Sequence, residues 1–173
     1  MPTFDLKEPI IYKTDYNVET AGQLDNKIRE KYVQDQEKRM LLTEYPTVYV
    51  INDPIDKKES QYTVYVGETN DIQRRTLQHL DADPKKRDDF FNFKNSKNVS
   101  MYVIGHEHFN KSMTLDIENR LMQYLSSVPA VKHLNNRRHN DQNKYYDSTE
   151  FDALFDQIWK KLGRNNKRLF PAL

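Results

Sequence analysis

Residues 63–79 have the sequence TVYVGETNDIQRRTLQH, which joins two patterns. β-branched and aromatic residues dominate up to Gly67 and predict a strand. Helix-initiating polar residues stand at Asn70 and Asp71, and from there the apolar residues follow a 3.6-residue period. The stretch therefore predicts a strand that turns after Gly67 into a helix, a unit that holds its side chains in fixed positions.

The predicted helix has one apolar face with two basic residues along its edge. At about 100° per residue, that face carries Ile72, Thr76 and Leu80. Arg75 and His79 lie one turn apart at the rim of the face, whereas Arg74 lies toward solvent. An arginine and a histidine at the rim of a buried face, just beyond a tyrosine-bearing strand, form an arrangement suited to holding a phosphate.

A second strand precedes this unit at residues 47–51, TVYVI. The segment between the strands, residues 52–61, is rich in turn formers and charge, as expected of a hairpin loop. Each strand carries a central tyrosine, Tyr49 and Tyr65. Taken alone, two such tyrosines are typical of a cross-strand aromatic pair.

The order of these elements resembles the GIY-YIG nuclease superfamily, whose two short motifs lie on neighbouring antiparallel strands. Val48-Tyr49 matches the end of the first motif, and Tyr65-Val66-Gly67 is a near match to the second. Arg75 follows eight residues after Gly67, with His79 one turn further, as in the family pattern.

Two positions depart from that pattern. Thr47 stands where the first motif has a glycine, which bears on how closely a substrate can approach that strand. Many enzymes of the superfamily carry a lysine or another polar residue just after the second glycine, whereas Glu68 is found here and places a negative charge near the expected phosphate.

Residues 114–126 predict a helix with a carboxylate in its apolar stripe. That stripe carries Leu115, Leu121, Met122 and Leu125. Glu118 falls in its middle, and a buried carboxylate is costly unless it forms an ion pair or binds a cation. The residues alone leave both alternatives open. The resemblance implies that Glu118 is the metal ligand, for one Mg²⁺ or Mn²⁺.

The segment after residue 130 supplies further candidates. The resemblance implies an asparagine at the end of the family core, and Asn135, just after an apolar residue, is a better match than Asn136. Basic residues of the same segment, which would contact flanking phosphates of a nucleic acid, are Lys132, Arg137, Arg138 and Lys144. The alternative for these residues is a solvated loop.

Together the patterns predict an α/β (α+β) fold with a small three-stranded antiparallel sheet flanked by helices. The predicted strands are residues 47–51, 62–67 and 99–104, and the predicted helices are residues 20–42, 70–80, 114–126 and 149–162. Residues 1–20 are interpreted as a docked arm or an added edge strand. The expected division is an amino-terminal arm and helix at 1–45, a nuclease-like domain at 46–163, and a tail or linker start at 164–173. Such a linker would lead into a C-terminal domain of a longer chain.

Composition narrows the classes of protein. With 173 residues the chain is long enough for one compact domain with appendages, and the absence of cysteine excludes disulfides and thiolate metal sites. No apolar run is longer than a strand, so we expect no membrane contact. The absence of cysteine fits the reducing cytoplasm, where we expect the protein to be found. The net charge of +1 means that any contact with nucleic acid must be local.

The function that the resemblance implies is metal-dependent hydrolysis of a phosphodiester bond in nucleic acid, with DNA favoured over RNA. Arg75 would supply a fixed cation to the phosphate, and Tyr49 is the candidate general base, with Tyr65 and His79 positioning water or passing its proton on. The alternative is a catalytically weak domain that binds nucleic acid or docks a larger protein. The near-neutral charge favours this alternative, whereas the presence of both Arg75 and Glu118 favours the enzyme.

Overall fold

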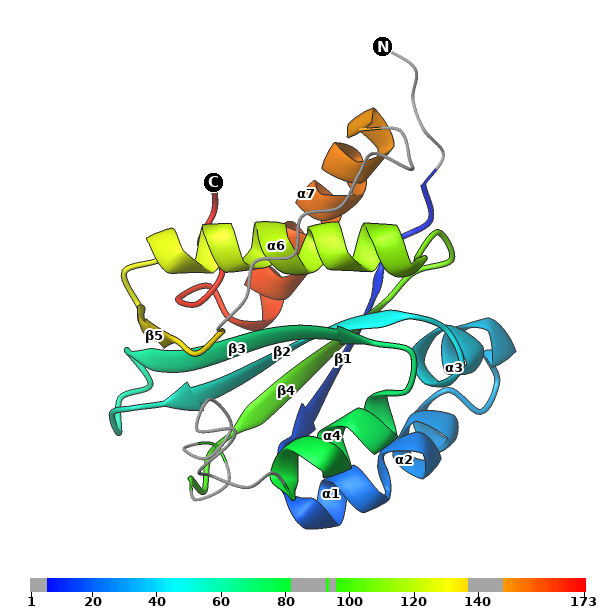
Figure 1. The fold of residues 1–173 in the computed structure, drawn as a ribbon, viewed down its shortest axis with the longest axis horizontal. Helices are drawn as coiled ribbons and strands as arrows, with labels where there is room; N and C mark the ends of the chain where they lie inside the picture. The colour runs from blue at the N-terminus through cyan, green and yellow to red at the C-terminus, as the bar shows by residue number, and fades with distance from the viewer. Residues whose placement is uncertain (1–5, 82–92, 94–95, 137–147) are drawn as a thin grey trace.

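The computed structural model of the chain describes residues 6–81, 93, 96–136 and 148–173. It is a mixed α+β fold in which helices cover both faces of one sheet (Figure 1). The strands are β1 (Ile10–Asp15), β2 (Thr47–Pro54), β3 (Tyr62–Thr69), β4 (Ser100–Gly105) and β5 (Val131–Leu134). The helices are α1 (Val18–Gly22), α2 (Leu24–Lys31), α3 (Gln36–Thr43), α4 (Ile72–Leu80), α6 (Lys111–Ser127) and α7 (Ser148–Asn165). The predicted fold class is confirmed.

The predicted number of strands is wrong, because within the described residues the sheet has five strands, in the order β1-β4-β2-β3-β5. The three predicted strands form its centre, where β2 pairs antiparallel with both β3 and β4. β1 adds to β4 antiparallel, which is the edge-strand alternative for the amino-terminal segment. β5 pairs with β3 in parallel and has only four residues, too few to give a strand signal in the sequence.

The single helix expected at residues 20–42 is also wrong, because three helices occupy this region. Asn17 caps α1 by accepting a hydrogen bond from the amide of Thr20, and Asp35 caps α3 by accepting one from the amide of Lys38. Side-chain caps of this kind start a new helix where a continuous one would otherwise run. The spacing of the apolar residues predicted the helical segments but not their breaks.

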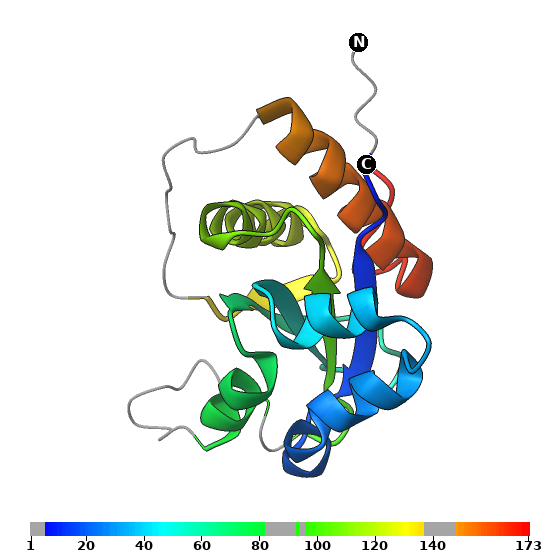
Figure 2. The same ribbon diagram turned by 90° about the vertical axis from the view of Figure 1, so that its right-hand side faces the viewer.

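The two faces of the sheet bury separate hydrophobic clusters, because successive strand residues point to opposite sides. Val48 and Val50 face α6 and α7, whereas Tyr49, Ile51 and Tyr65 face the helices α1 to α4. Figure 2 shows the two helical layers on either side of the sheet. The candidate tyrosines therefore lie on the same face as α4, which carries Arg75 and His79.

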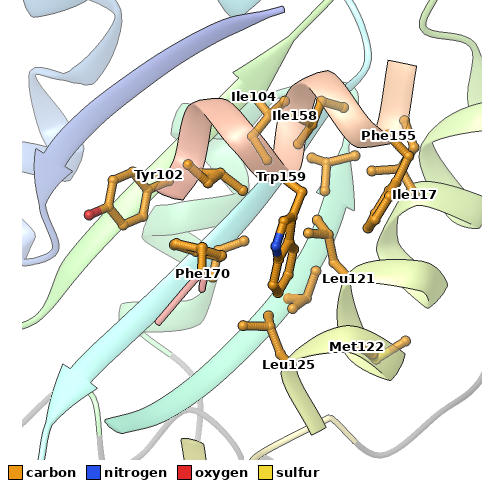
Figure 3. Packing of buried hydrophobic residues seen from close by; sticks show 14 of the residues in the cluster. Tyr102, Ile104, Ile117, Leu121, Met122, Leu125, Phe155, Ile158, Trp159 and Phe170 are labelled. Carbon is orange, nitrogen blue, oxygen red and sulfur yellow. The ribbon is translucent and has the colours of Figure 1, made fainter. Parts of the chain in front are cut away.

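The carboxyl-terminal residues pack against the core. Trp159 lies between α7 and the sheet, close to α6 residues such as Leu121 (Figure 3). Its indole Nε1 donates a hydrogen bond of 2.7 Å to the carbonyl of Pro171, and Leu169 and Phe170 are fully buried. The segment predicted as a tail thus contributes apolar side chains to the core, while the division into domains stays a prediction.

In the parts of the chain that the structure describes, no helix combines the length and apolar character needed to cross a membrane.

Candidate active site

The two motif strands bring Tyr49 and Gly67 directly opposite each other. They are register partners in the β2–β3 ladder, and Tyr65 lies two residues before Gly67 on the same face. A Cβ atom on Gly67 would lie 2.3 Å from both Cζ and the hydroxyl oxygen of Tyr49. The phenol of Tyr49 therefore crosses β3 at a place that only a glycine leaves open.

The imidazole of His79 completes a cluster of three buried rings. Its Nε2 lies 3.3 Å from the hydroxyl oxygen of Tyr49, within hydrogen-bonding distance. The ring centroids of Tyr49 and Tyr65 each lie 5.7 Å from that of His79, and the two tyrosine rings stack at 6.2 Å. The helix α4 thus presents His79 to both strands at once.

The two adjacent arginines of α4 point in different directions. Arg74 has 72% of its side chain exposed and lies 3.7 Å from Asp71, the residue that caps the helix. Arg75 reaches Tyr49, since its charge and a hydrogen bond both act on that phenol. The helical phase inferred from the sequence agrees with these positions.

Burial raises the pKa of the Tyr49 phenol well above its ordinary value, and the neighbouring Tyr65 raises it further. The charge and hydrogen bond of Arg75 oppose this shift, whereas the carboxylate of Glu118 adds to it. At neutral pH the phenol is therefore protonated. The same interactions indicate that Tyr65, Arg75 and Glu118 each lie within electrostatic reach of Tyr49.

Glu118 comes from the opposite side of the sheet, on α6, which packs against β2 and β3. It is only 8% exposed, and the other residues of its predicted stripe are buried as well. Its carboxylate acts on Tyr49 although α6 and α4 cover different faces. The candidate site thus lies where β2, β3, α4 and α6 meet.

A single carboxylate at this place suits Mg²⁺ better than a structural zinc ion. In the described residues there is no group of three or more histidine, aspartate or glutamate side chains that could hold a metal together. A structural zinc site, which needs four protein ligands, does not fit Glu118. Mg²⁺ fits, because it keeps several waters and binds through one or two carboxylates together with the phosphate oxygens of a substrate.

The two asparagines that follow β5 form hydrogen bonds to β3 in different ways. The backbone amide of Asn135 donates a hydrogen bond of 2.9 Å to the carbonyl of Val64. The side chain of Asn136 accepts from the amide of Val66 at 3.0 Å and donates to its carbonyl at 2.6 Å. Asn136 therefore replaces a peptide group of the ladder between the two motif residues Tyr65 and Gly67. Sequence reasoning missed this role, and the parallel pairing of β5 that creates it was not predicted.

Three predicted site residues, Arg137, Arg138 and Lys144, lie outside the residues that the structure describes. The five candidates Tyr49, Tyr65, Arg75, His79 and Glu118 converge, as the interactions above describe. Asn135 lies beside them on the edge of β3.

Replacing Gly67 by alanine tests the close approach of Tyr49. The added methyl group must displace the phenol, so we expect a loss of about 1–3 kcal/mol in the free energy of unfolding and a lower kcat in a cleavage assay. Gly22→Ala is the matched control, because its Cβ would meet no atom within 4 Å. A Gly67→Ala protein with the stability and kcat of the wild type would contradict the proposed position of the ring.

Comparison with known proteins identifies a family. The family model described as the GIY-YIG catalytic domain matches residues 45–135, which is more than half of the chain. No curated protein and no solved structure matches the chain. The matched range begins just before β2 and ends at Asn135, so it contains both motif strands, α4 and α6. From the match and the site within it, we conclude that the chain belongs to the GIY-YIG family.

Proposed function

We propose that the protein is a metal-dependent endonuclease that hydrolyses phosphodiester bonds of nucleic acid, with DNA favoured over RNA. Membership of the GIY-YIG family implies a nuclease. The observation that carries the finer proposal is the convergence of Tyr49, Arg75, His79 and Glu118 from three separate elements, β2, α4 and α6. Cations, a carboxylate and a proton-transfer pair are the groups that phosphodiester hydrolysis requires.

Arg75 would bind the non-bridging oxygens of the scissile phosphate. Its position is fixed by α4 and by its hydrogen bond to the phenol of Tyr49. A cation that is already oriented stabilises the charge that develops in the transition state without a cost of reorganisation. Arg74, which is turned to solvent, would contribute little.

Glu118 would hold one divalent cation, Mg²⁺ or Mn²⁺. When bound, such an ion supplies positive charge to the phosphoryl group and to the leaving 3′ oxygen. Glu118 suits this role because its carboxylate is nearly buried and lies within electrostatic reach of Tyr49, on which Arg75 also acts.

Tyr49 and His79 would remove the proton from the attacking water. The raised pKa of the phenol argues against a free phenolate as the base at neutral pH. The 3.3 Å contact with Nε2 of His79 offers a relay instead, in which the phenol passes its proton to the imidazole while it accepts one from water. Tyr65 would orient the water beside this pair. Tyr49 thus remains the proposed acceptor of the proton from water, and His79 accepts the proton that Tyr49 gives up.

Cleavage assays on duplex, flap and single-stranded DNA and on RNA, each with Mg²⁺, Mn²⁺ or EDTA, test the proposal. We expect cleavage that depends on the metal, with DNA as the better substrate. A protein that binds these substrates but cleaves none would instead be a docking or nucleic-acid-binding module. The net charge of +1, low for a protein that holds polyanions, favours that second candidate.

Arg137 and Arg138 are proposed to contact phosphates that flank the site, together with Lys144. Arg137→Ala combined with Arg138→Ala should weaken substrate binding and reduce the slope of log K against log salt by up to about two, because each contact releases about one counterion. Turnover at saturating substrate should persist. Salt titrations of binding measure this, with Arg29→Ala and Arg39→Ala on α2 and α3 as the control pair. Unchanged binding across the salt series would show that the two arginines do not contact the substrate.

A further inference from the structure

Glu68, which follows the motif glycine, is a nearly buried carboxylate held by the first turn of α6. Its side chain is 10% exposed, whereas its ion-pair partner Lys111 is 59% exposed. The hydroxyl of Thr114 donates a hydrogen bond of 3.3 Å to the other carboxylate oxygen of Glu68. The negative charge that sequence reasoning placed next to the phosphate is therefore neutralised by a lysine from another element.

Helix stability accounts for the carboxylate but not for the lysine. The start of a helix favours negative charge, and α6 has no acidic residue of its own in its first turn. Glu68 supplies that charge from β3. Lys111 is the first residue of α6, where the helix dipole disfavours a cation. Its position at this point needs a different reason.

The pair lies next to the candidate active site. Glu68 is bonded to Gly67, whose backbone lies against the hydroxyl of Tyr49. Lys111 lies seven residues before Glu118, so the two share one face of α6 and are roughly 10 Å, or two helical turns, apart along it. A nucleic-acid strand that runs along this face of α6 would bring to Lys111 a phosphate that flanks the one near Glu118. Lys111, which is 59% exposed, thus lies at the solvent-facing end of the helix face that carries Glu118.

We infer that Lys111, oriented by Glu68, binds a phosphate that flanks the scissile one in the nucleic-acid substrate. Lys111 is then a substrate-binding residue, and Glu68 is a positioning residue that limits the freedom of the lysine side chain. This inference rests on the proposed nuclease function. It gives a physical reason for an acidic residue after the motif glycine, because the carboxylate fixes a cation that reaches the substrate from α6.

Variants of the two residues separate these roles. Lys111→Gln should raise KM about tenfold, as expected for the loss of one charged contact, and lower the salt slope of binding by about one. kcat should change little, and Lys111→Arg should restore both KM and the slope. Glu68→Gln should raise KM less and leave the slope unchanged, because the cation remains. If Lys111→Gln folds poorly, the double variant Glu68→Gln, Lys111→Gln replaces it in these measurements, because it leaves no buried carboxylate without a partner.

Lys38→Gln is the matched control, since Lys38 is an exposed lysine in the first turn of α3 and lies 3.5 Å from the carboxylate of Asp35. If the wild type cleaves DNA and Lys111→Gln matches Lys38→Gln in KM and salt slope, the inference is overturned while the nuclease proposal stands. If the wild type cleaves nothing, the nuclease proposal fails. Binding of a DNA duplex in EDTA then still decides the contact: a lower salt slope for Lys111→Gln supports it, and an unchanged slope overturns it.

Discussion

Arg75→Ala should lower kcat by roughly 100- to 1000-fold, the loss expected when one preorganised group at a developing charge is removed. Arg74→Ala should leave kcat almost unchanged, because that side chain is 72% exposed and pairs with the helix cap Asp71. The two substitutions remove the same group from neighbouring positions of α4. Single-turnover cleavage rates at saturating metal and substrate measure the difference.

Arg75 also acts on the proposed proton relay. Its charge and hydrogen bond lower the pKa of Tyr49, so their removal should raise that pKa further and make the phenol a poorer proton donor to His79 in the relay. Arg75→Lys keeps the charge but loses the planar fork, and should recover part of the rate. Equal losses in Arg74→Ala and Arg75→Ala would contradict the assigned helical phase and the assignment of Arg75 to the phosphate.

The local patterns predicted the part of the site that depends on a single element. The alternation in residues 63–67 and the helical period after residue 70 gave the positions of Tyr65, Arg75 and His79, because side-chain direction follows from strand and helix geometry. The apolar stripe of α6 likewise placed Glu118 among buried residues. Each of these inferences needs only neighbours within one turn or one strand.

Features that depend on distant residues could not be predicted in this way. The pairing of β1 with β4 joins residues about ninety positions apart, and β5 is recognisable only from its parallel partner β3. The side chain of Asn136 and the pair of Glu68 with Lys111 are contacts of the same kind. Nothing in the sequence around Lys111 signals a partner on β3. The sheet therefore has two strands more than the local patterns indicated.

Glu118→Gln should bring cleavage to background while the protein remains folded. Glutamine has nearly the same size and keeps a hydrogen-bonding oxygen, but it lacks the charge that a divalent cation needs. Nucleic acid should still bind, since Arg75 and Lys111 remain. Cleavage in Mg²⁺ and Mn²⁺ and binding in EDTA measure the two effects separately.

Metal binding at Glu118 also has a readout that does not depend on activity. A cation that binds only the folded protein stabilises it by mass action, so the Tm of the wild type should rise with the Mg²⁺ concentration. The Tm of Glu118→Gln should not. Glu37→Gln is the control for the substitution itself, because Glu37 forms an exposed ion pair with Lys7 at 2.8 Å, and such pairs contribute little to stability.

The competing role for Glu118 is one half of a buried ion pair, and the same variant gives the opposite result in that case. Removing the carboxylate would strand the charge of its partner at a cost of about 3–5 kcal/mol. For a chain of this length such a loss lowers the Tm by something on the order of 10 °C. The nuclease proposal would be contradicted by three results together. Glu118→Gln would be strongly destabilised, the Tm of the wild type would not change with Mg²⁺, and the wild type would cleave no substrate. The docking module would then be the function that the site supports, because a buried pair between α6 and its surroundings stabilises the domain without performing chemistry.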